Sequence, residues 1–373
     1  MCNNSVFERY KRQMKTIKIK IVDKTETERM NSCFGENQYK DFVDILLEVL
    51  SEEYNVEFSD NPQYVFSILP VGMAKGYEYY RYSDCVQCQI ILENVKPDFN
   101  CFDYAIGSFH DFSFESRFLY LPATLMCTDQ ARNAYKDALV KHEEIDDSLC
   151  KRKFCSFVVS NGKNAAGERE AFFRLLNEYK KVDSGGRFLN NVGGPVKDRV
   201  SFEREHKFSI VFENSWQSQV TEKIDMAFAA KTVPIYWGNP RAKEIYNEGA
   251  FIDCNSFESF EDVVQEVLRI DRDDEIYLQY LKTPAYKKSI SSEEYRKRLK
   301  AFLKKMIETP RSEAIIRSEV GWNKKLQVIR YRGFRRDYAK RVVMNCIYKT
   351  YSCSLGRVKR LFFKKEKDSN ARK

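Results

Sequence analysis

Six charged or amide side chains stand within one short stretch, FENSWQSQVTEK at 212–223, where an apolar run ends and a new apolar pattern begins. Glu213 and Asn214 close the run, and Glu222 and Lys223 open the pattern, which has the spacing of a helix. A lysine in the first turn of a helix lies where free backbone N–H groups and the helix dipole favour an anion. The stretch therefore fits a site for an anionic ligand, and the alternative interpretation is an ordinary solvated turn.

The elements that must hold these residues follow from the apolar pattern, in which short strand-like runs alternate with amphipathic helical ones. In the first half we expect strands at 16–22, 64–69, 88–93 and 103–107 and a helix at 38–54. In the second half we expect strands at 153–160, 208–212, 232–238 and 250–254, and helices at 167–181, 221–230 and 259–270. This alternation predicts an α/β fold with parallel sheets, whose ligand crevices lie beyond the carboxyl ends of the strands.

A polar, charged stretch at 128–150 predicts a helix and a linker between two α/β units. A chain of 373 residues is long enough for two such units, each with its own core. We place the first unit at 14–148 and the second at 149–310. Residues 311–373 are expected to form a separate basic, amphipathic tail.

The composition argues against a secreted, membrane-spanning or metal-centred protein. No stretch reaches the roughly 18 apolar residues of a spanning helix, and the N-terminus has no secretory signal. The 11 cysteines are scattered, with a single CxxC at Cys85 and Cys88, and the three histidines are far apart. We therefore expect reduced cysteines in a cytosolic protein without a metal site.

Three motifs occur in order within 212–238: FENS, TEK and VPIYWG. Together they resemble the signature of the family 10 α-1,3/α-1,4-fucosyltransferases. Further resemblances lie at 91–107 and 117–122, which are similar to the acceptor-domain motif of bacterial members, and at 156–161 and 169–173, which are similar to the start of the donor domain. The resemblance implies a GT-B architecture, with two Rossmann-like domains facing across a cleft. It also implies transfer of fucose from GDP-β-L-fucose with inversion.

An inverting transfer needs a general base that deprotonates the acceptor hydroxyl as it attacks. Glu93 ends an expected strand and resembles the base that the family is proposed to use. Without the resemblance, Glu93 is equally an acid at a strand end that bonds to a turn. Asp98 and Asp103 are competing carboxylates in the same loop.

The departing diphosphate needs positive charge. By resemblance, Lys223 and Arg169 are the pyrophosphate ligands, the first as a compact charge and the second as a fork for phosphate oxygens. Glu222 resembles the family's glutamate that accepts ribose hydroxyls, and Asn214 can donate to a phosphate or sugar oxygen. These four residues are the predicted donor site, and we expect no obligatory metal ion or other cofactor.

Four further residues are possible donor contacts. Glu213 is either a ligand group or a structural tie between the strand end and the loop. Lys207 and Tyr236 flank the same expected sheet end, where an aromatic residue is more often core than contact. The family has six residues between FENS and TEK, but five stand here, and Gln219 occupies the place of a tyrosine. Trp216 is the candidate to supply the missing ring.

The basic charge is concentrated in the tail. Residues 324–373 hold 17 Lys or Arg against three acids, a net +14, which leaves −5 for the rest of a chain whose total is +9. Basic amphipathic segments with aromatic residues suit an anionic membrane surface. The alternatives are a solvated tail or nonspecific binding of nucleic acid. We expect a peripheral protein of the inner face of a bacterial membrane, with no specific nucleic-acid partner.

The resemblance implies an α-1,3-fucosyltransferase that acts on a GlcNAc-containing acceptor of N-acetyllactosamine type, in the synthesis of surface polysaccharide. One alternative is a GT-B glycosyltransferase with another donor or acceptor. A second is a degenerate protein that binds a nucleotide sugar without transferring it, which the shortened spacer between FENS and TEK motivates.

Overall fold

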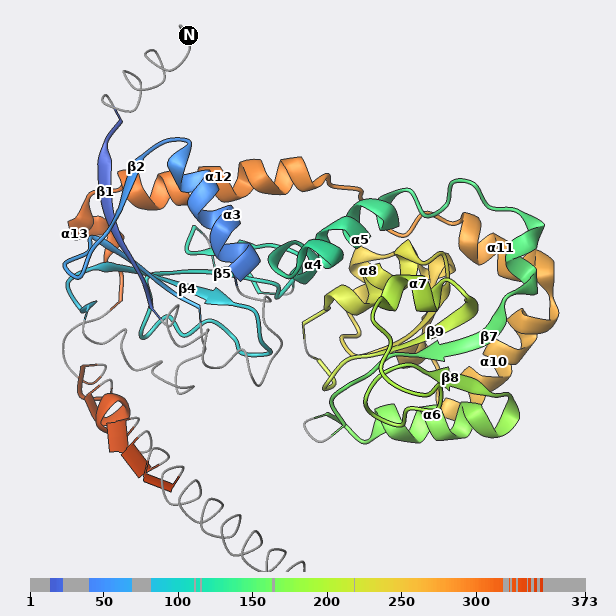
Figure 1. Ribbon diagram of the computed structural model, residues 1–373. Helices are drawn as coiled ribbons and strands as arrows, with labels where there is room; N and C mark the ends of the chain where they lie inside the picture. The colour runs from blue at the N-terminus through green and yellow to red at the C-terminus, as the bar shows by residue number, and fades with distance from the viewer. Residues whose placement is uncertain are drawn as a thin grey trace, which may run out of the picture.

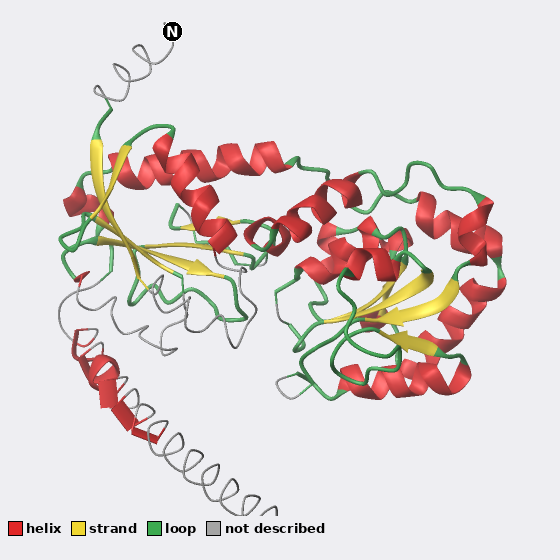
Figure 2. Ribbon diagram, viewed as in Figure 1, coloured by secondary structure: helices red, strands yellow, loops and turns green. Residues whose placement is uncertain are grey.

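The computed structural model describes residues 14–22, 40–68, 82–110, 112–114, 116–162, 165–217 and 219–317, with scattered residues between 322 and 344. These residues form two α/β units side by side, each built on one sheet (Figure 1). Figure 2 shows helices packed around the strands of each unit. The predicted α/β architecture with two Rossmann-like domains is therefore confirmed.

The first unit contains a six-stranded sheet in the order β2-β1-β3-β4-β5-β6, and its strand pairs are parallel. The strands are β1 (Thr16–Val22), β2 (Asn55–Phe58), β3 (Tyr64–Ser67), β4 (Val86–Ile91), β5 (Tyr104–Gly107) and β6 (Phe118–Tyr120). Every residue of β3, β4 and β5 is buried, as expected of central strands in a parallel sheet that is covered on both faces. The outer strands β2 and β6, which the sequence pattern did not predict, are short and more exposed.

Two helices from distant parts of the chain pack together on this sheet. Helix α3 (Lys40–Ser51), within the helix expected at 38–54, buries Phe42 and Leu46. Helix α12 (Ser292–Glu308) returns from the second unit, buries Leu299 and Leu303, and lies beside α3 (Figure 1). The Tyr64 hydroxyl donates to the Ile307 carbonyl in the last turn of α12. The helix α12 and the short α13 (Arg311–Ala314) therefore pack on the first unit, whereas the predicted boundaries placed α12 in the second unit at 149–310.

The second unit contains a five-stranded parallel sheet in the order β11-β10-β9-β7-β8. Its strands are β7 (Lys153–Phe157), β8 (Val182–Ser184), β9 (His206–Phe212), β10 (Val233–Trp237) and β11 (Ile252–Asp253). The helices around it are α6 (Glu168–Tyr179), α7 (Arg199–Glu203), α8 (Glu222–Ala229), α9 (Ala242–Ile245), α10 (Phe260–Arg272) and α11 (Asp274–Lys282), with short 3-10 turns η3 (Glu248–Ala250) and η4 (Cys254–Ser256). The strand order reverses between β7 and β9, the position at which open parallel sheets bind ligands.

The two units meet at α4 (Ala123–Met126) and α5 (Asp129–Leu139) of the first unit and α8 of the second. The 3-10 turn η2 (Asp147–Lys151) follows α5 and leads into β7. Ala131 and Ala134 of α5 are small enough to let that helix lie close to Met226 and Ala229 of α8. The carboxyl ends of both sheets turn toward this junction, as the facing arrows of β4 and β7 show (Figure 1).

The described residues of the predicted tail between 322 and 344 are helical. Trp322, Leu326 and Ile329 are exposed there at one-turn spacing, and Arg330 forms an ion pair with Asp98 at 2.8 Å. The remainder of the tail, with the run LGRVKRLFFKK, lies outside the described residues. Within the described residues, no helix combines the length and apolar character needed to cross a bilayer.

Candidate active site

The turn between β9 and α8 is held by a buried carboxylate. Glu213 is the first residue after β9 and is 0% exposed. Its Oε1 accepts hydrogen bonds from the backbone N–H and hydroxyl of Thr221 at 2.8 and 2.9 Å, and its Oε2 accepts from Lys223 Nζ at 3.0 Å. Thr221 stands at the expected N-cap position, but its hydroxyl bonds to Glu213 instead of capping the helix. Of the two roles left open for Glu213, the contacts favour the structural one.

The end of β10 and the glycine that follows it pack against the Glu213 side chain. The Glu213 N–H donates to the Trp237 carbonyl at 2.9 Å, and a Cβ at Gly238 would stand 2.6 Å from Glu213 Cγ. Tyr236 is 0% exposed, and its hydroxyl accepts from the backbone N–H of Asn239 at 3.1 Å. Tyr236 is therefore a core residue, the more common role that its strand position indicated.

Arg169 joins the two strands at which the sheet order reverses. It is the second residue of α6 and only 2% exposed. Its Nη2 donates to the Phe212 carbonyl at 2.7 Å and to Asn214 Oδ1 at 2.8 Å, and its Nη1 donates to the Asn161 carbonyl at 3.2 Å. Burial lowers the pKa of the guanidinium, and the Glu213 carboxylate opposes that shift. Its Nε is buried without a hydrogen-bond partner in the described structure.

The predicted donor residues are thus brought together at one sheet edge. Arg169 bonds directly to Asn214, and Asn214 follows Glu213, which holds Lys223. The Lys223 side chain retains 18% exposure, and Asn214 is exposed. Glu222 is half-buried at the start of α8, and its Oε2 lies 4.0 Å from Cys127 Sγ of the first unit. Two cations, one amide and one carboxylate therefore lie along the rim that faces the first unit.

Glu93 stands on the opposite rim. Strand β4 ends at Ile91, two residues earlier than expected, so Glu93 belongs to the loop beyond the strand and is half-buried. Its neighbour Asn94 donates through Nδ2 to Ser215 Oγ at 2.8 Å. Since Ser215 follows Asn214, this bond joins the loop of the predicted base to the turn that carries the predicted donor residues.

The two competing carboxylates have other partners. Asp103 is 0% exposed and is paired with Arg317, whose backbone N–H also donates to it at 3.1 Å. Burial raises the pKa of Asp103, and Arg317 opposes that shift. Asp98 is paired with Arg330, and its N–H donates to Gln89 Oε1 within β4 at 3.0 Å, which turns it back along the sheet. Both carboxylates are therefore engaged in ion pairs, Asp103 with Arg317 and Asp98 with Arg330.

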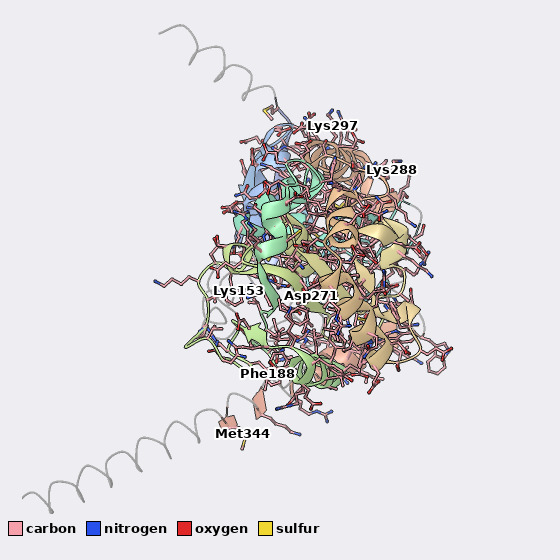
Figure 3. The ribbon with its side chains drawn as sticks, turned by 90° about the vertical axis from the view of Figure 1, so that its right-hand side faces the viewer. Lys153, Phe188, Asp271, Lys288, Lys297 and Met344 are labelled. Carbon is pink, nitrogen blue, oxygen red and sulfur yellow. The ribbon has the colours of Figure 1, made fainter. Side chains whose placement is uncertain are left out.

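Lys207 was predicted at the wrong end of its strand. Strand β9 begins at His206, two residues before the expected start, so Lys207 lies near its amino end, about 16 Å from Phe212 at the rise of a strand. Its ammonium group donates to the Asp271 carbonyl at 3.0 Å. Figure 3, which views the molecule from the right-hand side of Figure 1, labels Asp271 in the same region as Lys153, the first residue of β7.

The loop between FENS and TEK also differs from expectation. Trp216 is 54% exposed, so its ring is not packed into the junction between the two units. Gln219, which occupies the place of the family's tyrosine, is buried between the two units and contacts Ser108 and the Leu92 carbonyl. Sequence reasoning missed Ser108 and Asn94 as groups that join the units, and single polar residues after strands give no local signal for such a contact.

Among the residues that the structure describes, no group of three or more His, Cys, Asp and Glu side chains is arranged to hold a metal ion. Cys85 and Cys88, the pair of the CxxC, form no disulfide and are both buried. Burial raises the pKa of the Cys85 thiol, which agrees with a packing role.

Two family profiles match the chain in order. The profile "Alpha-(1,3)-fucosyltransferase FucT N-terminal domain" matches residues 33–127, and "Glycosyltransferase family 10 (fucosyltransferase) C-term" matches residues 149–316. The alpha-(1,3)-fucosyltransferase FucT of Helicobacter pylori is 30% identical over 280 residues, which cover 66% of this chain and 58% of that protein. The chain therefore spans less than two thirds of the length of this curated relative.

Solved structures agree with the profiles. A crystal structure of an alpha1,3-fucosyltransferase is 25% identical with a TM-score of 0.65, and the match covers 83% of this chain and 94% of that one. A structure of an alpha1,3-fucosyltransferase with GDP-fucose is 25% identical with a TM-score of 0.60, covering 80% and 92%. Because the two profiles together match more than half of the sequence, and the fold agrees over most of its length, the chain belongs to glycosyltransferase family 10, the fucosyltransferases.

Proposed function

We propose that this protein is an inverting fucosyltransferase that moves L-fucose from GDP-β-L-fucose to a GlcNAc-containing acceptor in α-1,3 linkage. The observation that carries the proposal is the hydrogen bond between Asn94 and Ser215, because it joins the Glu93 loop to the Asn214 turn. A base and a set of groups for an anionic leaving group then face each other between two sheets. The similarity to a fucosyltransferase with bound GDP-fucose supports the choice of donor.

Glu93 is the proposed general base. An acceptor hydroxyl becomes a better nucleophile as it loses its proton, and a carboxylate on the rim opposite the donor groups can take that proton. Direct attack on the anomeric carbon, on the face opposite GDP, inverts its configuration. Asp103 is a poor candidate for this role because it is fully buried and paired with Arg317.

Lys223 and Arg169 are proposed to stabilise the diphosphate as it leaves. Lys223 stands in the first turn of α8, whose free N–H groups and dipole add to its charge. Arg169 is preorganised by three carbonyl or amide oxygens, so little reorganisation is needed when the diphosphate charge develops. Asn214 is proposed to donate to a phosphate or sugar oxygen, and Glu222 to accept the ribose hydroxyls.

These two cations motivate the proposal that turnover needs no obligatory metal ion or other cofactor. Positive charge from side chains can serve the same purpose as a metal ion at a leaving diphosphate. Activity of the purified protein should therefore persist in excess EDTA, and a requirement for added Mg²⁺ or Mn²⁺ would contradict this part of the proposal.

We propose that the acceptor is of N-acetyllactosamine type, and that the reaction belongs to surface polysaccharide synthesis at the inner face of a bacterial membrane. The exposed, evenly spaced Trp322, Leu326 and Ile329 beside basic residues support attachment of the tail to anionic lipid. Co-sedimentation with vesicles of phosphatidylglycerol, compared with vesicles of phosphatidylcholine alone, tests this attachment. Equal binding to both, or to neither, would contradict it.

Donor choice is tested by thermal shift with GDP-fucose, GDP-mannose and UDP-sugars, followed by GDP release with N-acetyllactosamine. We expect the largest stabilisation from GDP-fucose and turnover with this acceptor. Greater stabilisation by another donor would favour a different glycosyltransferase activity. Binding of GDP without transfer to any acceptor in a broad panel would favour a degenerate binding protein.

A further inference from the structure

Gln219 spans the junction between the two units. It precedes α8 and is 5% exposed. Its Oε1 accepts a hydrogen bond from Ser108 Oγ at 2.5 Å, and its Nε2 donates to the Leu92 carbonyl at 3.3 Å. Ser108 directly follows β5, and Leu92 directly follows β4, so both partners lie at the carboxyl edge of the first sheet. The side chain thus turns across the junction and bonds to the first unit.

These contacts flank the proposed base on both sides along the chain. Leu92, which precedes Glu93, is bonded through its carbonyl to Gln219, and Asn94, which follows it, is bonded through its side chain to Ser215. One short loop of the second unit therefore bonds to both neighbours of Glu93, to the backbone carbonyl of Leu92 and to the side chain of Asn94. The same loop leads directly into the turn that carries Lys223.

We propose that Gln219 is a positioning residue, which fixes Glu93 relative to the donor groups of the second unit. The inference rests on the proposed function, since it assigns Glu93 the role of base. It differs from the degenerate binding protein without transfer that the shortened spacer between FENS and TEK motivates. Gln219, in the place of the family's tyrosine, instead gives this chain a polar link between the two rims.

An amide side chain suits this link. Ser108 supplies a hydroxyl donor and Leu92 a carbonyl acceptor, and a glutamine offers one acceptor and two donors at the end of a single side chain. Methionine has nearly the same length and shape but makes neither bond. Gln219→Met therefore removes both hydrogen bonds while it fills most of the same volume.

The expected signature is a loss of turnover without a loss of donor affinity. A base that is displaced by a fraction of an ångström slows the chemical step, whereas the contacts to GDP remain. We expect Gln219→Met to lower kcat for fucosyl transfer by about tenfold, from the loss of two buried hydrogen bonds. The Kd for GDP should stay within about twofold of the wild-type value, a split that general destabilisation would not produce.

Ser108→Ala removes the hydrogen bond between Ser108 and Gln219 from the side of the first unit and leaves Gln219 intact. It should lower kcat by a smaller factor, about threefold. In the double variant the two losses should be less than additive, because both substitutions remove the same hydrogen bond. Gln217→Met is the matched control, since Gln217 lies in the same loop but is exposed, and it should retain wild-type kcat.

The experiment measures kcat at saturating GDP-fucose and acceptor, together with the Kd for GDP and the melting temperature, for all five proteins. A wild type that is folded but inactive overturns the proposed function, and the positioning role with it. An active wild type whose kcat is unchanged in Gln219→Met overturns the positioning role alone. A raised Kd for GDP with unchanged kcat also overturns it, because Gln219 would then act on the donor. If Gln219→Met has a much lower melting temperature, Ser108→Ala and the control decide the outcome.

Discussion

Lys223 Nζ lies 3.0 Å from Glu213 Oε2, so a fully buried carboxylate holds the lysine at the start of α8. The same carboxylate binds the backbone of Thr221 and is covered by Gly238. Glu213, which has a structural role, and Lys223, the proposed ligand of the diphosphate, thus belong to the same turn. This relationship separates the two glutamates of the stretch FENSWQSQVTEK, since Glu222 is half-buried and Glu213 is not exposed at all.

Glu213→Gln should destabilise the protein. The amide nitrogen of glutamine would face either Lys223 or the donors of Thr221, so a buried hydrogen-bond group loses its partner. We expect the free energy of unfolding to fall by about 1–3 kcal/mol. The measurement is denaturant unfolding followed by fluorescence at neutral pH.

Glu222→Gln is the matched comparison for this measurement. Its carboxylate is half-buried and makes only a long contact, at 4.0 Å, with Cys127 among the contacts of the described residues. Its unfolding free energy should stay close to that of the wild type, while its affinity for GDP falls. The reverse pattern, with Glu222→Gln the less stable variant, would show that the two roles had been exchanged.

Arg317→Met should cause a larger loss of stability. Arg317 is paired with Asp103, and it also donates to the carbonyl of Cys85 at 3.0 Å. Removing the guanidinium leaves the buried Asp103 carboxylate without its charged partner, which costs about 3–5 kcal/mol. Thermal and denaturant unfolding of the full chain measure the loss.

The control for Arg317→Met is Arg330→Met, which breaks the exposed ion pair with Asp98. The two side chains of that pair are 45% and 23% exposed, so its loss should cost less than about 1 kcal/mol. Equal losses of stability in the two variants would mean that the ion pair between Arg317 and Asp103 does not anchor the segment after α13 to the first unit.

Asp225 makes the stability of the junction depend on pH. It is buried on α8 and accepts hydrogen bonds from Tyr246 and Tyr286 at 2.9 and 2.5 Å, and from Thr124 of the first unit. Burial raises its pKa from 3.8 to about 6, with Glu222 adding to the shift and the hydroxyl donors opposing it. Because the folded protein holds this proton more tightly than the unfolded chain, the associated stability is present near pH 4 and is lost as pH rises through 6.

Asp225→Asn removes this titration. The free energy of unfolding of the variant, relative to that of the wild type, should therefore rise by about 3 kcal/mol between pH 4 and pH 8. This change is expected whether the variant is more or less stable than the wild type at pH 4. Melting temperatures of both proteins across that range measure the difference. A difference that stays constant over the range, or a variant that becomes less stable relative to the wild type as pH rises, would contradict the assignment to Asp225.

Much of the fold could be predicted because its longer strands and helices carry strong local patterns. The apolar runs of β1 and β9 and the amphipathic repeat of α3 each specify their own structure. Strands β2 and β8 could not be found, since four and three residues carry too little periodicity. The packing of α12 on the first unit depends on contacts with α3, hundreds of residues away in the sequence.

The position of a residue could be predicted from the sequence where a single element fixes it, but not where two elements do. Lys223 is placed by the start of a single helix. The burial of Glu213 depends on the neighbouring strand and Gly238, so its role stayed open. Lys207 was misplaced because it lies at the amino end of β9, whereas Tyr236 lies near the carboxyl end of the parallel strand β10. The link between Gln219 and Ser108 needs two sheets and has no local pattern.

The central claim is that Glu93 is the base of a GDP-fucose-dependent transfer, and one comparison tests it most directly. Fucosylated product from GDP-fucose and N-acetyllactosamine is measured for the wild type, Glu93→Gln and Asp98→Asn, with linkage determined by NMR and the Kd for GDP measured in parallel. Asp98→Asn is the control because its carboxylate belongs to the same loop but is paired with Arg330.

We predict an α-1,3-linked product from the wild type and near-normal turnover by Asp98→Asn. Glu93→Gln should lose about 10²- to 10⁴-fold in kcat while its Kd for GDP is unchanged, because only the proton acceptor has been removed. Turnover by Glu93→Gln at the wild-type rate would contradict the account.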